Sequence, residues 1–474
     1  MSGRPVRRAG LGARLIDLVG DVSLASPARF AIIVFALLVG VFTLLFSLPV
    51  ATTSGQQAPF IDALFTAVSV VCVTGLSTVD MATFWSPFGH VLVFLGVEVG
   101  GIGVLTLASI LGLIISRRLG LRQKLLAAGD ANPLRLHRGP VAESQAVRLG
   151  ETGGLLLTVA TSVLVIEGVV AVLLFPRMLL NGDDPWSAAW QSVYTSAMAF
   201  TNTGFLPTTE GLAPYSHDVW FLIVLMIAVV FGAIGFPVIY ALRRSWRTPR
   251  HWSLHVKLTL ATFGILLVGG AVAYFIIESG NPATLGDKDV GQQILQSFFL
   301  STMARSGGFA TFDTNQLGGA GLLVTDMLMF VGGGSASTAG GIKVTTLAVL
   351  FIAAFAEARG TDDMDAAGRR IPQDVLRVAV SVVLWAATIV VAATIVLLMI
   401  TGAPLDRVLF DVISAFATCG LSTGFTQQAP EAAQYVLAAT MFMGRVGTIT
   451  LAAAVAASSR PRLYHRPEER PIVG

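Results

Sequence analysis

Eight long apolar stretches run through this chain and constrain its fold more than any other feature. A helix needs about 20 apolar residues to cross a bilayer. Only 12% of the chain is charged, whereas a soluble domain carries about 25%. The sequence therefore predicts an all-α polytopic membrane protein that lies in a lipid bilayer and binds no nucleic acid. The stretches cover residues 28–50, 88–116, 152–176, 219–242, 258–278, 321–356, 379–401 and 434–458.

Four shorter and less apolar stretches alternate with the long ones. Each has roughly 12 residues of helical character, a length of ~18 Å that crosses only half a bilayer, and then a glycine turn. Backbone that is not helical is tolerated at membrane depth only where it is buried in protein or lines a water-filled cavity. These stretches therefore predict a pore, and they cover residues 58–80, 186–206, 290–310 and 406–422.

The two kinds of stretch combine into a repeated unit of outer helix, pore helix, filter loop and inner helix. The sequence predicts four such pseudo-symmetric repeats around a central pore, with the third inner helix broken. A second glycine recurs in each inner helix, namely Gly103, Gly235, Gly341 and Gly447.

The basic residues orient the repeats, because most of the 31 Lys and Arg lie at the termini and in the links between repeats. By the positive-inside rule both termini are cytoplasmic, and the filter loops enter from outside the cell membrane. The predicted parts are the N-terminus 1–27, repeat 1 at 28–116, a link at 117–151, repeat 2 at 152–245, a link at 246–257, repeat 3 at 258–357, a link at 358–378, repeat 4 at 379–459 and the C-terminus 460–474.

The glycine turns have the composition of a cation filter. Rings of backbone carbonyls can replace the hydration shell of a cation, and glycine takes the backbone angles that aim such carbonyls at an axis. A helix cap or a close-packing position is the better explanation for any one of the 49 glycines taken alone, but four at matching places favour a filter. Leu76, Phe205, Phe309 and Leu421 follow the central glycines and should pack against the pore helices. The predicted filter consists of Val73, Thr74, Gly75, Asn202, Thr203, Gly204, Ser306, Gly307, Gly308, Thr418, Cys419 and Gly420.

Four inner-helix motifs carry a family resemblance. They read MFVGGGSASTAGGIK at 329–343, MGRVG at 443–447, VGGIG at 99–103 and AIGFP at 233–237. With these motifs the chain resembles the Trk/Ktr/HKT superfamily of K+ transporters, and most closely its bacterial KtrB-type pore subunit. Two positions depart from the usual pattern: the third filter has the double glycine Gly307-Gly308, and Glu98 stands where a neutral polar residue is commoner.

The resemblance implies a function and partners. A glycine at position 75 implies selectivity for K+, which is the transported ion, with no covalent cofactor. It also implies a homodimer of pore subunits on a cytosolic, nucleotide-binding ring of KtrA type. The alternative within the same fold is a Na+-permeable or Na+-coupled cation transporter, and a role of Na+ as modulator stays open.

A glycine-rich run in the third inner helix predicts a gate. Each glycine costs a helix up to ~1 kcal/mol relative to alanine, so the run should form a loop that obstructs the pore. Arg445 either holds this loop closed or pairs with an acid such as Glu98, and Lys343 reaches the cytoplasmic mouth or snorkels to the interface. The predicted gate residues are Gly332, Gly333, Gly334, Ser335, Ser337, Thr338, Gly340, Gly341, Lys343 and Arg445.

The remaining polar residues at membrane depth should have structural roles. Arg305 borders the third filter and should turn away to bond a carboxylate or backbone carbonyls. Glu98, Glu167 and Asp326 should form hydrogen bonds between helices, or carry protons as in proton-coupled transporters. Cys72 and Cys419 are expected to be unpaired.

Two other classes of protein fit the sequence less well. A secondary transporter for an organic solute predicts inverted repeats, whereas these repeats run parallel. A membrane enzyme should show a catalytic motif, but the sequence has no H-E-x-x-H, no nucleophile elbow and no metal cluster among its six histidines. We therefore expect a transport protein and not an enzyme.

Overall fold

The computed structural model describes residues 27–105, 152–361 and 363–447. The predicted cytoplasmic N-terminus, first link and C-terminus lie almost wholly outside the described residues. So do the far ends of the apolar stretches 88–116 and 434–458.

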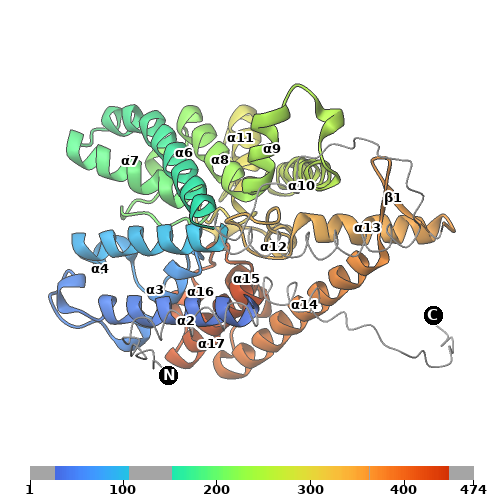
Figure 1. Ribbon diagram of the computed structural model, residues 1–474. Helices are drawn as coiled ribbons and strands as arrows, with labels where there is room; N and C mark the ends of the chain where they lie inside the picture. Colours follow the sequence, from blue (N-terminus) through green and yellow to red (C-terminus); the bar gives the residue numbers. More distant parts are fainter. Residues whose placement is uncertain (1–26, 106–151, 362, 448–474) are drawn as a thin grey trace, which may run out of the picture.

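The described part of the chain is mainly helical and contains one short antiparallel hairpin (Figure 1). Four short helices, here called the half-helices, are α3 (Phe60–Val71), α7 (Pro185–Phe200), α11 (Val290–Met303) and α15 (Leu405–Ala417). The other main helices are α2 (Pro27–Phe46), Pro87–Leu105, α6 (Thr152–Leu180), α8 (Val219–Ile234), α9 (Phe236–Ser245), α10 (Leu254–Glu278), α12 (Gly319–Phe330), α13 (Val344–Ala358), α14 (Gln373–Thr401) and α17 (Glu431–Phe442). The hairpin pairs β1 (Met364–Ala366) with β2 (Arg369–Ile371).

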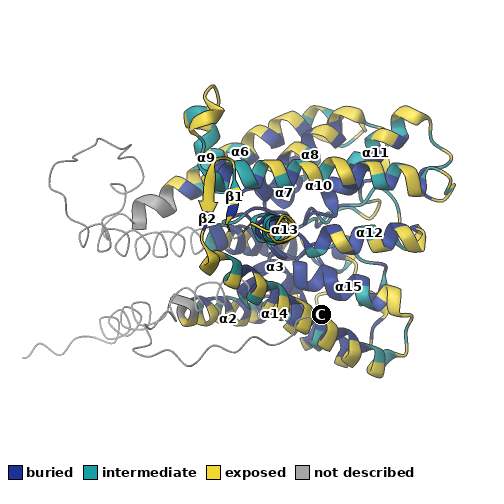
Figure 2. Cartoon of the chain, turned by 90° about the vertical axis from the view of Figure 1, so that its right-hand side faces the viewer, coloured by how far each residue is buried: buried dark blue, intermediate teal, exposed yellow. Residues whose placement is uncertain are grey.

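Several helices have the length and composition of membrane spans. Among the described residues four helices qualify, namely Pro87–Leu105, Thr158–Leu180, Leu254–Glu278 and Gln373–Thr401. Their outward faces are apolar, as at Leu384, Trp385 and Met399 on α14, which are exposed. Figure 2 shows these yellow outer faces around a dark-blue interior that contains α3. The all-α, multi-pass membrane architecture is thus as the sequence predicted.

Each half-helix packs against two neighbours, and these contacts close a ring. Within a unit the outer helix packs on the half-helix, in the pairs α2 with α3, α6 with α7, α10 with α11 and α14 with α15. The inner helix then packs on the next half-helix, in the pairs α8 with α11, α12 with α15 and α17 with α3. The helix Pro87–Leu105 meets α7 through the rings of Phe94 and Trp190, 6.0 Å apart. Because the fourth unit contacts the first, the half-helices surround one centre.

Local sequence signals start the half-helices. The Asp184 carboxylate accepts hydrogen bonds from the backbone N–H groups of Trp186 and Ser187 at the start of α7. Asp289 caps α11 in the same way, through the N–H of Gln292. Such side chains satisfy N–H groups that have no partner inside the helix. The half-helices therefore begin close to where the sequence predicted them.

The second inner helix is not the continuous span that 219–242 predicted. It bends by 103° between α8 and α9, at Gly235, whose φ is +89°. Pro237 then occupies the first turn of α9, where its missing N–H costs nothing. A Cβ at Gly235 would lie 2.6 Å from the Ser335 carbonyl oxygen, so the bend makes room for backbone of the third unit.

The third inner helix is interrupted, as predicted. α12 ends at Phe330 and α13 begins at Val344, and we call residues 331–343 the intramembrane loop. Its two ends meet at a parallel bridge between Val331 and Ile342.

Two of the four inner-helix glycines that the sequence pattern singled out pack closely, Gly235 and Gly341, and the other two do not. A Cβ on Gly103 or Gly447 would meet no described atom within 4 Å. Glycines three residues before Gly103, Gly235 and Gly447 also take a close position. A Cβ on each of these would collide with a carbonyl in the last turn of a half-helix, in the pairs Gly100 with Val71, Gly232 with Phe200 and Gly444 with Phe416.

We predict that Gly235→Ala lowers the free energy of unfolding by about 1–3 kcal/mol, because alanine is strained at positive φ and its Cβ meets the Ser335 carbonyl. The measurement is the melting temperature of the detergent-solubilised protein. Gly264→Ala is the control, since a Cβ there meets nothing within 4 Å inside α10. Equal melting temperatures of the two variants would contradict the strained bend.

Candidate functional site

The four predicted filter segments meet at the centre of the ring. We call residues 73–75, 202–204, 306–308 and 418–420 the glycine loops. A Cβ on Gly204 would lie 2.6 Å from the carbonyl carbon of Gly308, and one on Gly308 would lie 2.7 Å from the Cys419 oxygen. A Cβ on Gly420 would lie 2.6 Å from the Thr74 oxygen, and one on Gly75 would collide with Thr203. The loops therefore follow one another around the centre in chain order.

The glycine loops share one backbone pattern. Positive φ occurs at every central glycine and again two residues earlier, while the residue between them has negative φ. Alternation of this kind turns successive carbonyls to the same side of the chain. The central glycines have φ of +93° at Gly75, +82° at Gly204, +74° at Gly308 and +95° at Gly420, and the earlier residues have +56° at Val73, +63° at Asn202, +75° at Ser306 and +46° at Thr418.

The positive φ of Val73 and Thr418 is costly, because β-branched residues rarely adopt it. Such backbone persists only where its surroundings hold it. The Ser69 hydroxyl accepts a hydrogen bond from the Gly75 N–H at 3.1 Å, and the Ser414 hydroxyl accepts one from the Gly420 N–H at 3.2 Å. Both serines stand six residues before the central glycine, and this shared spacing is a signal in the sequence from which their role could have been predicted.

Side chains around the glycine loops agree with the sequence predictions. Leu76, Phe205, Phe309 and Leu421 are all buried. Cys72 and Cys419 are buried and free, as expected.

The intramembrane loop is hydrogen-bonded to the glycine loops. The Thr338 hydroxyl donates to the Asn202 side-chain oxygen at 2.6 Å. The Gly340 N–H donates to the Ser306 hydroxyl at 3.1 Å, and that hydroxyl donates to the Thr418 carbonyl at 2.8 Å. The predicted gate and the predicted filter are therefore one connected structure.

The bent second inner helix holds the other side of the intramembrane loop. The N–H groups of Gly334 and Thr338 donate to the carbonyls of Ala233 and Gly232, at 2.7 and 3.2 Å. In return the Phe236 N–H donates to the Ala336 carbonyl at 3.2 Å. The bend frees these backbone groups, and the loop satisfies them.

Further hydrogen bonds lie within the intramembrane loop and between it and the first turn of α13. The Ser337 hydroxyl donates to the Gly334 carbonyl at 2.7 Å, and the hydroxyls of Ser335 and Thr345 lie 3.1 Å apart. Lys343 is bonded to the same loop. Its ammonium donates to the Ala339 carbonyl at 2.7 Å, because the short loop brings this carbonyl within reach.

Arg445 is buried and also bonds the intramembrane loop. It lies in the π-helical turn Met443–Gly447, and its guanidinium donates to the Thr338 carbonyl at 2.6 Å. A longer contact of 3.5 Å reaches the Thr418 hydroxyl. The alternative pairing with Glu98 is wrong, because the guanidinium is directed to the loop instead.

Arg305 turns away from the ring centre, as expected. Its guanidinium donates to the Phe263 carbonyl at 2.6 Å and to the Gly332 carbonyl at 3.1 Å, and it stacks over the Phe263 ring. One buried side chain thus joins α10, the third glycine loop and the start of the intramembrane loop.

The buried acids Glu98 and Glu167 interact between two helices, Pro87–Leu105 and α6, in agreement with the expected contacts between helices. The carboxyl groups of Glu98 and Glu167 face each other, and Glu98 has no other hydrogen-bond partner among the described residues. One oxygen of Asp326 likewise has none there.

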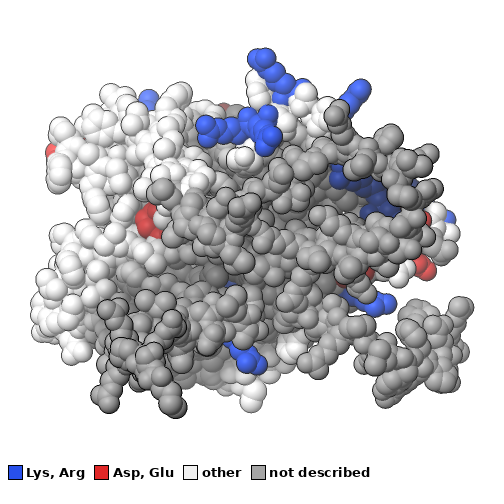
Figure 3. Space-filling view, viewed as in Figure 1, with Lys and Arg blue, Asp and Glu red and all other residues white. Residues whose placement is uncertain are grey.

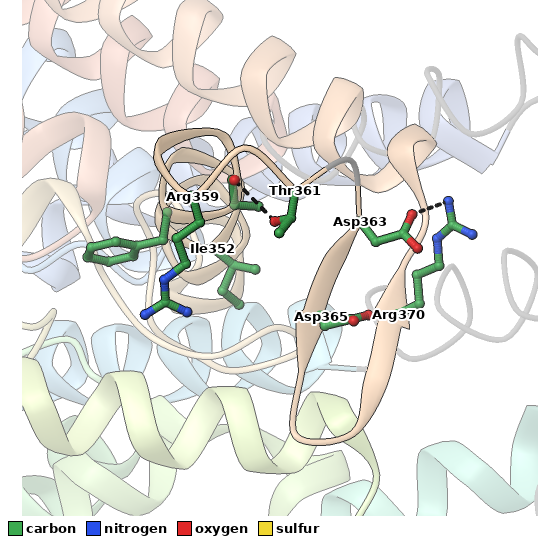
Figure 4. Close-up of a pocket in the computed structure, with 8 residues that line it drawn as sticks. Ile352, Arg359, Thr361, Asp363, Asp365 and Arg370 are labelled. Carbon is green, nitrogen blue, oxygen red and sulfur yellow. Dashed lines mark hydrogen bonds and ion pairs between the residues drawn. The ribbon is translucent and has the colours of Figure 1, made fainter.

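A cavity of about 960 Å³ lies away from the glycine loops, beside the hairpin (Figure 4). Arg359, Asp363, Asp365 and Arg370 line it, and Arg370 pairs with Asp363 at 2.5 Å. None of the residues that line it belongs to the glycine loops or to the intramembrane loop. Within the described residues no group of three or more His, Cys, Asp or Glu could hold a metal ion.

Basic side chains gather at one end of the molecule. Figure 3 shows Lys and Arg mainly over the upper and right-hand parts, around α9 and the hairpin, with few at the left-hand end. On the face that Figure 3 shows, the described basic residues are thus unevenly distributed.

The TrkH family model, described as a cation transport protein, matches residues 19–462. The chain belongs to this family. TrkH-family members are ion transporters and not enzymes, so the resemblance and the functional class predicted from the motifs are confirmed. The intramembrane loop and the glycine loops lie inside the matched region.

Curated relatives extend along most of the chain. It is 35% identical over 455 residues to the Ktr system potassium uptake protein D of Bacillus subtilis, and the match covers 95% of this chain and 97% of that protein. It is 32% identical over 432 residues to the Ktr system potassium uptake protein B of Vibrio alginolyticus, with 91% of each chain covered. The potassium/sodium uptake protein NtpJ of Enterococcus hirae is 29% identical over 459 residues, covering 95% and 97%.

A solved structure shares the fold. The crystal structure of the potassium transporter TrkH from Vibrio parahaemolyticus matches with a TM-score of 0.68 and 18% identity, over 90% of this chain and 83% of that one. The chain is accordingly a membrane component related to the Ktr and Trk potassium uptake proteins.

We predict that Arg305→Lys destabilises the protein by about 1–3 kcal/mol, because an ammonium group cannot reach both carbonyls and leaves one buried acceptor unpaired. The melting temperature in detergent measures this loss. Arg359→Lys is the control, since Arg359 is exposed. An unchanged melting temperature of Arg305→Lys would show that the two carbonyl bonds contribute little.

Proposed function

We propose that this TrkH-family chain is the K+-selective pore-forming subunit of a Ktr/Trk-type uptake system. K+ passes down its electrochemical gradient through the ring of glycine loops. The observation that carries the proposal is the shared alternation of φ at the central glycine and two residues before it, in all four units. It supports a ring of inward carbonyls contributed by residues 73–75, 202–204, 306–308 and 418–420.

Two physical terms favour a cation in such a ring. Carbonyl oxygens replace the hydration shell that the ion loses. The half-helices also end at the glycine loops, and the C-terminal end of a helix carries partial negative charge. No acidic side chain is needed in the ring, which agrees with the neutral composition of the loops.

K+ is a better-supported ion than Na+. Two of the reported relatives, at 35% and 32% identity, are named as potassium uptake proteins. One at 29% is named for potassium and sodium. The Na+-permeable alternative is therefore less favoured, and modulation by Na+ remains a separate question for measurement.

We infer that the intramembrane loop gates this pore. The loop is bonded to two glycine loops through Asn202 and Ser306, so its place is next to the ring. Arg445 bonds the loop from the fourth unit and brings a positive charge close to the pathway. A cation must therefore pass both a steric and an electrostatic barrier while the loop stays in place.

The topology and assembly belong to the same proposal. The four repeats have the boundaries given by the sequence, both termini are cytoplasmic, and the protein lies in the bacterial cell membrane. The subunit forms a homodimer on a cytosolic, nucleotide-binding ring of KtrA type, which supplies ligand control from a separate chain. The uneven distribution of described basic residues supports the orientation.

We predict that Gly75→Ser lowers the K+/Na+ preference about tenfold, which corresponds to ~1.4 kcal/mol. Serine is strained at the φ of Gly75, and its side chain collides with the Thr203 carbonyl. The measurement is K+ and Na+ uptake by bacterial cells without their own uptake systems, with a regulatory partner supplied.

Gly55→Ser is the matched control, because Gly55 also has positive φ but a Cβ there meets nothing within 4 Å. No K+ uptake by the wild-type chain would refute the proposed function. An unchanged preference in Gly75→Ser would refute the filter assignment alone.

We predict that Arg445→Ala speeds K+ uptake severalfold, because it removes a positive charge from the pathway and a bond that holds the loop. Uptake is normalised to the amount of protein in the membrane. Arg445→Lys keeps the charge but loses the planar fork, and it should fall between the two. A loss of folded protein without faster uptake per molecule would assign Arg445 a purely structural role.

A further inference from the structure

The carboxylate of Asp411 binds the segment that leaves the fourth glycine loop. It lies in α15 and is fully buried. One oxygen accepts hydrogen bonds from the N–H and the hydroxyl of Thr423, at 2.9 and 3.2 Å. The other accepts from the Ser422 hydroxyl at 2.7 Å and from the N–H and hydroxyl of Thr426, at 2.9 and 2.6 Å. A single side chain thus holds residues 422–426.

The other units carry weaker forms of this contact. The third residue after the central glycine is threonine in three units, and its hydroxyl donates to a half-helix side chain. Thr78 donates to Asp62, and Thr311 donates to Gln296, each at 2.6 Å. The second unit has Pro207 at this place, and proline has no side-chain donor. Among the described residues, Asp411 therefore makes more hydrogen bonds of this kind than its counterparts in the other units.

The chemistry of the site calls for a carboxylate. Both oxygens of Asp411 act as acceptors, and each receives one backbone N–H. An amide would turn one acceptor into an NH₂ donor that faces other donors. Bonds to a carboxylate are also stronger than those between neutral groups. Hence Asp411 holds its segment more firmly than asparagine of the same shape could.

The segment that Asp411 holds is continuous with the strained part of the ring. Thr418 and Gly420 both have positive φ, and Ser422 follows two residues later. The Ser422 carbonyl also accepts a hydrogen bond from the Thr314 hydroxyl of the third unit. Fixing residues 422–426 therefore restrains Gly420 from its outgoing side, as Ser414 does from its incoming side.

We propose that Asp411 is a positioning residue that sets the ion preference of the ring by fixing the outgoing arm of the fourth glycine loop. The inference rests on the proposed function of the ring as a K+ filter. Asp411 would then determine the width of the ring at Gly420, and hence which ion the carbonyls fit. It would not determine the amount of folded protein.

The test compares Asp411→Asn with Asp62→Asn, the same change at a half-helix acid that has one such bond. We expect the K+/Na+ uptake preference to fall about tenfold in Asp411→Asn, the effect of losing one hydrogen bond to a charged group. The fall in Asp62→Asn should be less than about twofold, because the amide oxygen of asparagine can still accept the one bond from Thr78. Asp411→Glu, which restores a carboxylate, should recover part of the preference. Uptake of each ion is normalised to the protein in the membrane.

Thr423→Val is a milder variant for the case that Asp411→Asn folds poorly, because it removes only one hydroxyl donor. It should also lower the K+/Na+ uptake preference. A reduced protein level with unchanged preference in both variants would overturn the inference and leave Asp411 a structural role. Absence of K+ uptake by the wild-type chain would instead refute the proposed function, and the inference with it.

Discussion

The structure depends on one constraint, that backbone which leaves the helical state inside a membrane must find its hydrogen bonds within the protein. The glycine loops and the intramembrane loop are both non-helical backbone at the centre of the molecule. Each loop supplies hydrogen-bond partners to the other, through Thr338 with Asn202 and through Gly340 with Ser306. A change in either loop would therefore leave polar groups of its neighbour without a hydrogen-bond partner.

Two buried arginines serve this constraint in different ways. Arg305 bonds the carbonyls of Phe263 and Gly332, and so anchors the beginning of the intramembrane loop. Arg445 bonds the carbonyl of Thr338, near the middle of the loop, from another unit. The first belongs to the same unit as the loop and has a stacked ring beneath it, whereas the second has a single short bond. Arg445 thus bonds one backbone carbonyl, whereas Arg305 bonds two.

Much of the site could be predicted from the sequence, because glycine and helix length leave clear marks. The half-helices and the break after Phe330 were found close to their observed ends. The bend at Gly235 was missed, since an isolated glycine in an apolar run is equally compatible with a straight helix. The roles of Asp411, Ser69 and Ser414 were also missed. Their hydrogen-bond partners come later in the sequence and meet them only once the chain has turned at the glycine loop. The pairing of Arg445 with Glu98 was misjudged for the same reason.

The sequence by itself determined that the chain lies in a membrane, that it repeats one unit four times, and that each unit places a glycine where the backbone leaves a half-helix. These features follow from composition and local conformational preference, which act within a few residues. Only the tertiary structure decided that the third unit's loop rests on the second inner helix, that two arginines bond carbonyls and not acids, and that Asp411 holds the fourth loop. Those contacts depend on which hydrogen-bond donors and acceptors of different units come together in space, and the sequence alone does not state this.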